Sequence, residues 1–217
     1  MIIGISGYMH SGKDTLGQII LDLTKVKNHT VIEDEFGRPQ TDTKGNYVTY
    51  PDISTFKIRK FAGKLKEMAS LMTGIPVEKF EDQEFKSGYM PSEWGDMTVR
   101  QFLQRLGTDA VRHHLHTDAW VISAMAGYTE SDNWVFTDCR FPNEAQAIKD
   151  RGGIIIRINR YPPGMSPVFM DRTESEVSLD NWEFDHVIYN VGTIDDLRAQ
   201  IKNILSEELF KMKNYAN

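Results

Sequence analysis

The sequence predicts an α/β protein in which a largely parallel β-sheet is covered by helices on both faces, giving three layers. Short apolar runs alternate with amphipathic segments along the chain, as strands alternate with helices in this class. A glycine-rich loop, GYMHSGK at residues 7–13, joins the first apolar run to the first amphipathic segment. The 217 residues, 40% of them hydrophobic, can bury one full core. We therefore expect a single domain over residues 1–217.

The expected elements follow one another in a regular order. Buried strands are predicted near residues 1–6, 56–61, 133–138, 154–160 and 186–190. Helical segments are predicted near residues 13–25, 63–74, 98–115, 117–128, 142–151 and 193–209. Thr98 is a typical N-cap, and Gly74 is a typical residue after the end of a helix. Because helices separate the strands, we expect the strands to run parallel.

Two stretches fall outside this alternation. Residues 31–53 are polar and contain turn-forming sequences such as EFGRP, which predicts a surface hairpin inserted into the domain. Residues 160–175 predict a loop that closes over a nucleotide as a lid, with Arg157, Arg160 or Arg172 as its cation.

Composition restricts the class of partner. The net charge of -6 argues against a nucleic-acid polymer, which usually requires a basic face. No apolar run approaches the roughly 18 residues that a membrane-spanning helix requires. Cys139 is the only cysteine, which excludes an intrachain disulfide and favours a reducing compartment such as the cytoplasm.

The loop at residues 7–13 matches the phosphate-binding pattern G-x-x-x-x-G-K, which predicts a P-loop NTPase fold with ATP as ligand. Glycine lets backbone amides approach phosphate oxygens, and the N-terminus of the following helix favours anions. Lys13 would neutralise the β and γ phosphates. The expected nucleotide-binding residues are Gly7, Ser11, Gly12, Lys13, Asp14 and Thr15. The alternative is a glycine turn that only joins a strand to a helix.

Asp14 occupies the position at which phosphate loops usually carry a magnesium-binding Ser or Thr. The helix dipole favours an acidic residue in the first turn, which is the structural alternative for this position. Beside a triphosphate, a carboxylate makes chemical sense if Mg²⁺ lies between the two, because hard cations prefer oxygen ligands. Asp14 is therefore the expected metal ligand, and Thr15 is expected to contact a nucleotide phosphate.

Several motifs occur together in the order in which they occur in one known family. These are GKDT, FAGKLKE, RQFLQRLGTD with Trp120 after it, TDCRFPNEA followed by GGIIIRINR, and the closing segments TESEVSL, FDHVIYN and TIDDLRAQI. In this order they resemble the bacteriophage deoxynucleoside monophosphate kinases over most of the chain, with residues 31–53 as an insertion that need not be shared. The resemblance implies transfer of the γ-phosphoryl group of ATP to a 5′-deoxynucleotide, giving ADP and a dNDP. It also implies that ATP lies at the first loop and the monophosphate lies across the carboxyl edge of the sheet, where open α/β sheets bind ligands.

The resemblance implies roles for further residues. Lys66 matches the substrate-binding lysine of the family. The monophosphate-binding positions are matched by Arg100, Gly107, Thr108 and Trp120. Arg100 would hold the phosphate with its planar fork, and Gln104, one helical turn away, is a candidate for reading the base. The alternatives are solvated polar side chains, a helix-ending glycine and a core tryptophan.

Three more candidates surround the end of the predicted strand 133–138. Asp138 would orient magnesium or bind a substrate hydroxyl, and Arg140 would place positive charge at the same edge. Glu144, at the start of the following helix, is a further substrate-binding candidate. With Lys13 and Asp14, we expect Asp138 and Arg140 to be catalytic, since phosphoryl transfer needs cations and positioning groups more than covalent chemistry. The alternative is a structural ion pair that caps the helix.

Other functions were weighed against this interpretation. A switch-type GTPase should carry a guanine-reading Asn-Lys-x-Asp or Thr-Lys-x-Asp element, and the chain has neither. A kinase acting on a small metabolite such as dephospho-coenzyme A or phosphomevalonate stays open, as does a non-catalytic ATP-binding protein. The expected partners are ATP and a deoxynucleoside monophosphate, and a homodimer stays open because no pattern defines an interface. The accepted bases are not determined, and the expected location is the cytoplasm, that of the host if a phage encodes the protein.

Overall fold

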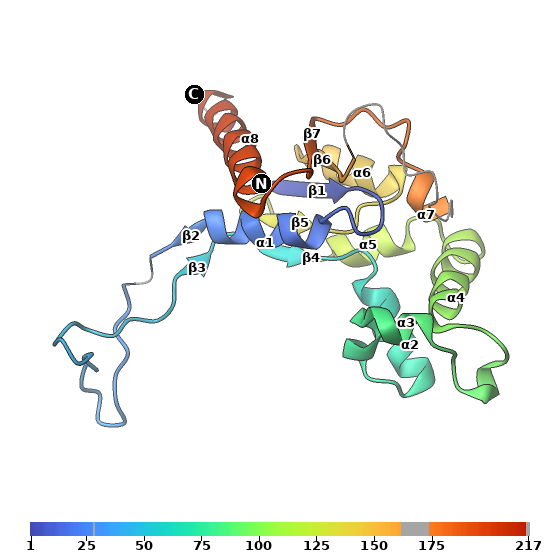
Figure 1. Ribbon diagram of the computed structural model, residues 1–217, viewed down its shortest axis with the longest axis horizontal. Helices are drawn as coiled ribbons and strands as arrows, with labels where there is room; N and C mark the ends of the chain where they lie inside the picture. Colours follow the sequence, from blue (N-terminus) through green and yellow to red (C-terminus); the bar gives the residue numbers. More distant parts are fainter. Residues whose placement is uncertain (28, 162–173, 216–217) are drawn as a thin grey trace.

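The computed structural model describes residues 1–27, 29–161 and 174–215. Its centre is a five-stranded sheet in the order β4-β5-β1-β6-β7, with every neighbouring pair parallel (Figure 1). These strands are β1 (Ile2–Ser6), β4 (Lys57–Arg59), β5 (Trp134–Phe136), β6 (Ile154–Asn159) and β7 (His186–Tyr189). The structure thus confirms the predicted parallel α/β sheet.

Helices cover both faces of this sheet because side chains of successive strand residues point to opposite sides. Ile3 and Ile5 of β1 pack in one core cluster with helices α1 (Lys13–Leu23) and α8 (Ile194–Tyr215). On the opposite face, Ile2 packs in a second cluster with α5 (Ala119–Met125) and α6 (Pro142–Lys149). The three-layer arrangement expected from the sequence is confirmed.

A helical lobe stands beside the carboxyl edge of the sheet (Figure 1). It has a core of its own, in which Phe80 is fully buried and Val99 and Phe102 pack. Its elements are α2 (Gly63–Thr73), the 3₁₀ turns η1 (Val77–Glu81) and η2 (Ser92–Trp94), α3 (Gln83–Ser87) and α4 (Val99–Gln104). The lobe forms a wall opposite the strand ends.

The helix predicted over residues 98–115 is interrupted. Thr98 caps α4 as expected, because its hydroxyl accepts a hydrogen bond from the Gln101 amide, and the Thr98 amide donates one to Oε1 of the Gln101 side chain. From Arg105 to His113, however, the backbone widens into a π-helical segment, η3. Such wide turns are rare and frequently lie at functional sites.

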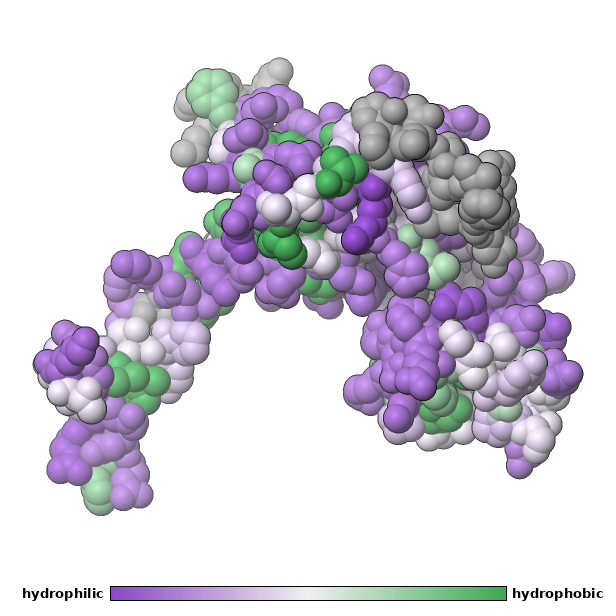
Figure 2. Space-filling model, in the orientation of Figure 1, coloured by the Kyte–Doolittle hydropathy of each residue, from purple (hydrophilic) through white to green (hydrophobic). Residues whose placement is uncertain are grey.

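Strands β2 (Lys25–Val26) and β3 (Ile53–Ser54) pair as a separate two-stranded sheet. Residues 31–53 form an arm that projects from the domain at this small sheet (Figure 1). The arm has isolated bridges, such as Val31 with Thr49, in place of regular strands. Its surface is largely hydrophilic with small apolar patches (Figure 2). Most of the predicted lid lies outside the described residues, which resume at the short helix α7 (Glu174–Val177). None of the described helices combines the length and apolarity that crossing a membrane demands.

Candidate active site

The candidate active site is a pocket at the carboxyl edge of the sheet. Residues that follow β1, β4 and β5 line one side, and residues of the lobe and of η3 line the other. Its basic side chains are Lys13, Lys60, Lys66, Lys86, Arg100, Arg112 and Arg140, and its acidic ones are Asp14, Glu81, Asp138, Glu144 and Glu176. A pocket with so many cations is suited to phosphorylated ligands.

The phosphate loop joins β1 to α1 and depends on its glycines. Gly12 has a φ of 104°, and a Cβ atom there would lie 2.6 Å from Nδ2 of Asn190. A Cβ atom on Gly7 would lie 2.5 Å from the Ile158 carbonyl oxygen. Both positions therefore require glycine, and the loop opens directly into the N-terminus of α1, which favours an anion.

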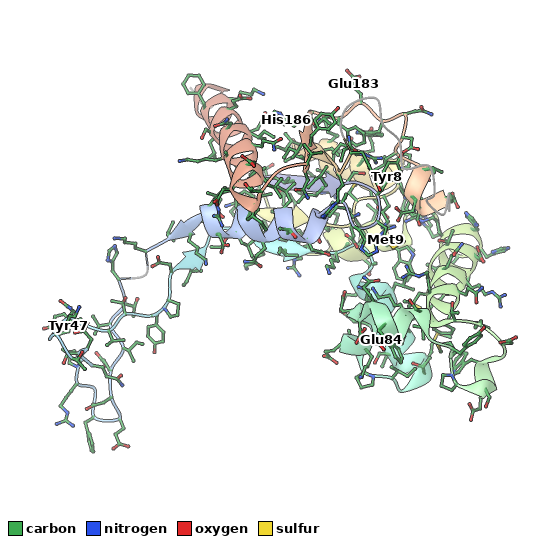
Figure 3. All side chains as sticks on the ribbon, viewed as in Figure 1. Tyr8, Met9, Tyr47, Glu84, Glu183 and His186 are labelled. Carbon is green, nitrogen blue, oxygen red and sulfur yellow. The ribbon has the colours of Figure 1, made fainter. Side chains whose placement is uncertain are left out.

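Lys13 lies inside this loop. Its ammonium donates hydrogen bonds to the carbonyl oxygens of Gly7 at 2.6 Å and Tyr8 at 2.7 Å. Burial lowers the pKa of Lys13 to about 8, and the nearby charge of Arg140 acts in the same direction. Figure 3 labels Tyr8 and Met9 of the loop, which lie beside α7. The buried hydroxyl of Ser11 has no hydrogen-bond partner within the described ranges, which leaves it available to a ligand.

Asp14 projects from the first turn of α1. Its side chain is 78% exposed, and its Oδ1 accepts a hydrogen bond from the Thr137 hydroxyl at 2.9 Å. Within the described parts of the chain, His, Cys, Asp and Glu form no cluster of three that could hold a metal. One exposed carboxylate fits Mg²⁺, which proteins commonly bind through one or two carboxylates together with substrate phosphates. Thr15 is exposed beside Asp14 but does not line the pocket.

Asp138 makes two backbone contacts across the pocket floor. Its carboxylate accepts hydrogen bonds from the amides of Phe61 and Ala62, each at 2.9 Å. Burial raises the pKa of Asp138, and these two donors oppose that rise. Since α2 starts at Gly63, Asp138 fixes the beginning of the helix that carries Lys66.

Arg140 is paired with a carboxylate that the sequence did not predict. Its guanidinium pairs with Glu176 of α7, and Glu176 also accepts a hydrogen bond from the Met9 amide of the phosphate loop at 2.8 Å. The Arg140 amide donates to Glu144 at 2.8 Å. Arg140 therefore stands between the phosphate loop and α6.

Glu144 forms a buried ion pair with Arg112. Its Oε1 lies 2.8 Å from Nη2 of Arg112, and its Oε2 accepts hydrogen bonds from the amides of Arg140 and Phe141. Burial raises the pKa of Glu144 to about 7. Arg112 stacks over the Phe141 ring at 3.7 Å and was not predicted. Both charged side chains are buried, yet both line the pocket.

The lobe contributes the substrate-binding candidates. Lys66 pairs with Glu81 at 2.5 Å, and Arg100 lies 3.4 Å from the Gln83 amide oxygen. The other three candidates in η3, α4 and α5 line the same pocket: Gln104, Thr108 and Trp120. The Trp120 indole donates a hydrogen bond to the Gly107 carbonyl at 2.8 Å, so it also supports the π-helical segment. The pocket is thus lined by all six of these substrate-binding candidates: Lys66, Arg100, Gln104, Gly107, Thr108 and Trp120.

Known proteins resemble this chain in sequence. The sequence model of the deoxynucleotide monophosphate kinase family matches residues 52–201. The chain belongs to this family. A putative deoxynucleotide monophosphate kinase of Acanthamoeba polyphaga mimivirus is 29% identical over 158 residues, which cover 66% of this chain and 79% of that protein. The deoxynucleotide monophosphate kinase of Enterobacteria phage T4 is 29% identical over 113 residues, covering 50% of this chain and 45% of that protein.

The deoxynucleotide monophosphate kinase of Escherichia phage RB69 is 28% identical over 113 residues, covering 50% of this chain and 45% of that protein. Each phage match therefore spans less than half the length of the relative. Among solved structures, a shikimate kinase from Bacteroides thetaiotaomicron aligns over 95% of this chain and 98% of its own, with 13% identity and a TM-score of 0.39. Membership of the deoxynucleotide monophosphate kinase family makes the protein a nucleotide kinase.

For this member of the deoxynucleotide monophosphate kinase family, the lid cation was expected to be Arg157, Arg160 or Arg172. Arg157 lies on β6 and is buried beneath the phosphate loop. Its guanidinium donates to the Ser6 hydroxyl and to Asp180, and it stacks on the Tyr8 ring at 4.4 Å. Arg160 is exposed, and Arg172 lies outside the described residues.

Five charged residues of this kinase pocket escaped sequence reasoning: Arg112 and Glu176, described above, and Lys60, Glu81 and Lys86. Lys60 directly follows β4, which was the available signal, because side chains after parallel strands meet at the carboxyl edge. Glu81 and Lys86 come from short lobe elements without clear periodicity, and only the packing of the lobe brings them to the pocket. Burial lowers the pKa of Lys86, as do the neighbouring charges of Lys66 and Arg100.

Proposed function

We propose that the protein transfers the γ-phosphoryl group of ATP to the phosphate of a 5′-deoxynucleoside monophosphate, giving ADP and a deoxynucleoside diphosphate. Membership of the family supports this reaction. The observation that carries it is one shared pocket, which Lys13 and Asp14 line from the phosphate loop and Lys66 and Arg100 line from the lobe. A kinase with two phosphorylated substrates needs two such anion-binding sides facing each other.

The phosphate loop is proposed to hold ATP. The unpartnered Ser11 hydroxyl, the buried Lys13 ammonium and the N-terminus of α1 all suit phosphate oxygens. Phosphate would replace the Gly7 and Tyr8 carbonyls as the partner of Lys13. Asp14 would hold Mg²⁺, which, when bound, offsets the charge of the β and γ phosphates.

The lobe and η3 are proposed to hold the deoxynucleotide. Lys66 and Arg100 would bind its phosphate, since both are cations that line the pocket from the lobe. Trp120 lines the pocket and anchors Gly107, so it would shape the wall against which the base packs. Gln104 and Thr108 lie on the same side and are proposed to provide polar contacts to the nucleoside.

Between these two sides, Arg140 is proposed to stabilise the phosphoryl group in transit, because preorganised cations act strongly where charge develops. Asp138 is proposed to act by holding the start of α2, and with it Lys66, in position. Glu144 holds Arg112 and the Arg140 backbone and would thereby shape the acceptor side.

The test is a coupled ADP-release assay with ATP, Mg²⁺ and a panel of acceptors. The panel contains dAMP, dGMP, dCMP, dTMP, the ribonucleoside monophosphates, dephospho-coenzyme A and phosphomevalonate. Acceptor-dependent ADP release with one or more deoxynucleotides is expected. Activity with a small metabolite alone would instead identify a small-metabolite kinase, and ATP binding without any acceptor-dependent release would identify a non-catalytic ATP-binding protein. A reaction on free nucleotides would take place in the cytoplasm.

A further inference from the structure

Lys60 lies between the two sides of the pocket. Its Nζ is 3.6 Å from Oδ1 of Asp14, which belongs to the phosphate loop side. The same Nζ is 3.4 Å from Oε2 of Glu81, and the other oxygen of Glu81 holds Lys66 on the lobe side. The ammonium of Lys60 therefore spans the gap between the groups proposed to hold ATP and those proposed to hold the deoxynucleotide.

The surroundings of Lys60 keep it charged. Burial favours the neutral form, but the carboxylates of Asp14, Glu81 and Asp138 outweigh burial and raise the pKa of Lys60. Its side chain is 30% exposed, so the ammonium reaches the pocket from a partly enclosed position. A lysine held in this way offers a positive charge throughout the neutral pH range.

The two partners of Lys60 differ in how firmly they hold it. Glu81, which at 47% exposed is more enclosed than Asp14, accepts a hydrogen bond from Lys60 at 3.4 Å and binds Lys66 at 2.5 Å, so this carboxylate contacts both lysines. Asp14 is 78% exposed, and ion pairs with exposed groups contribute little stability. Lys60 can therefore exchange Asp14 for a phosphoryl oxygen while Glu81 keeps it in place.

We propose that Lys60 is a catalytic residue whose ammonium binds an oxygen of the phosphoryl group as that group passes from ATP to the acceptor. The inference rests on the proposed function. An oxygen of the acceptor phosphate forms the new bond to the γ phosphorus, and the bond from that phosphorus to the bridging oxygen breaks, with its electron pair passing to ADP. Lys60 keeps its proton, and its contact strengthens as negative charge accumulates on the moving group.

The proposal predicts that Lys60 acts on the transition state more than on either substrate. Lys60→Gln, which keeps a hydrogen-bond donor for Glu81, should lower kcat by about tenfold or more and leave both KM values within about threefold of the wild type. Lys60→Arg, which keeps the charge, should recover part of the loss. The matched control is Lys57→Ala, because Lys57 is an exposed lysine at the other end of the same strand, and its kcat should stay within about twofold.

The measurement is initial rate against ATP and against the best acceptor of the panel, with thermal melting to compare the folds. Lys60→Ala serves as a further variant. Because Lys60 is partly exposed, all three Lys60 variants should have melting temperatures close to that of the wild type. A kcat within about twofold of the wild type in Lys60→Gln would overturn the inference, as would a loss confined to the acceptor KM. Absence of acceptor-dependent release by the wild type would overturn the proposed function itself, which separates the two failures.

Discussion

The catalytic efficiency toward ATP, kcat/KM, should fall as the pH rises through about 8, because Lys13 loses its charge there. Burial inside the phosphate loop, together with Arg140, lowers the pKa of Lys13 from 10.5 to about 8. In the free enzyme the ammonium is therefore about nine-tenths charged at about pH 7 and about nine-tenths neutral at about pH 9. Since kcat/KM reports the ionisation of the free enzyme, we expect a loss of about tenfold between these pH values.

The assay is ADP release at ATP concentrations below KM with saturating acceptor. At saturating ATP, kcat should fall less, because bound phosphates favour the charged lysine and raise its pKa again. Lys13→Arg provides the control, since arginine stays charged over this range. Its kcat/KM should be lower than that of the wild type but should not decline between about pH 7 and about pH 9.

The same lowered pKa should appear in the stability of the protein without nucleotide. The unfolded lysine keeps its proton up to about pH 10.5, whereas the folded one loses it near pH 8. Between these values the unfolded state binds more protons, so the free energy of unfolding should rise with pH. Relative to Lys13→Met, the rise should total about 3 kcal/mol, measured by urea unfolding.

Two results would refute this reasoning. One is a wild-type kcat/KM for ATP that stays constant from about pH 7 to about pH 9.5, which would mean that Lys13 does not titrate in this range. The other is an equal fall in Lys13→Arg, which would assign the titration to another group.

Three further substitutions test the site. Asp14→Ala should reduce magnesium-dependent turnover far more than calorimetric binding of the monophosphate without ATP, and equal losses would mean that Asp14 mainly supports the fold. Gly107→Ala should destabilise the protein by about 1–3 kcal/mol in urea unfolding, because the new Cβ would lie 2.8 Å from Cδ2 of Leu65; unchanged stability would contradict this packing. Arg112→Met should cost about 3–5 kcal/mol of stability at pH 8 and less at pH 6, since Glu144, with a pKa of about 7, is ionised only at the higher pH; a pH-independent loss would contradict the charge pairing.

Features formed by residues close together in the sequence were predicted correctly, whereas most contacts between residues far apart were not. The phosphate loop is continuous, so Gly7, Gly12 and Lys13 could be assigned from their spacing. Short apolar runs and helical patterns likewise predicted the sheet and most helices, because each pattern records how a local element is buried. The π-helical segment at Arg105–His113 was not predicted, because its apolar spacing resembles that of an ordinary helix.

The sequence by itself determined the parallel α/β fold, the phosphate loop and the residue types at the pocket. Tertiary structure decided how those residues are used. It pairs Arg140 with Glu176, joins Asp138 to the amides of Phe61 and Ala62, and buries Arg157 beneath the phosphate loop. It also brings Lys60 between the two sides of the pocket. These contacts join residues far apart in the chain, and their geometry exists only after the strands have paired and the lobe has packed against the carboxyl edge of the sheet.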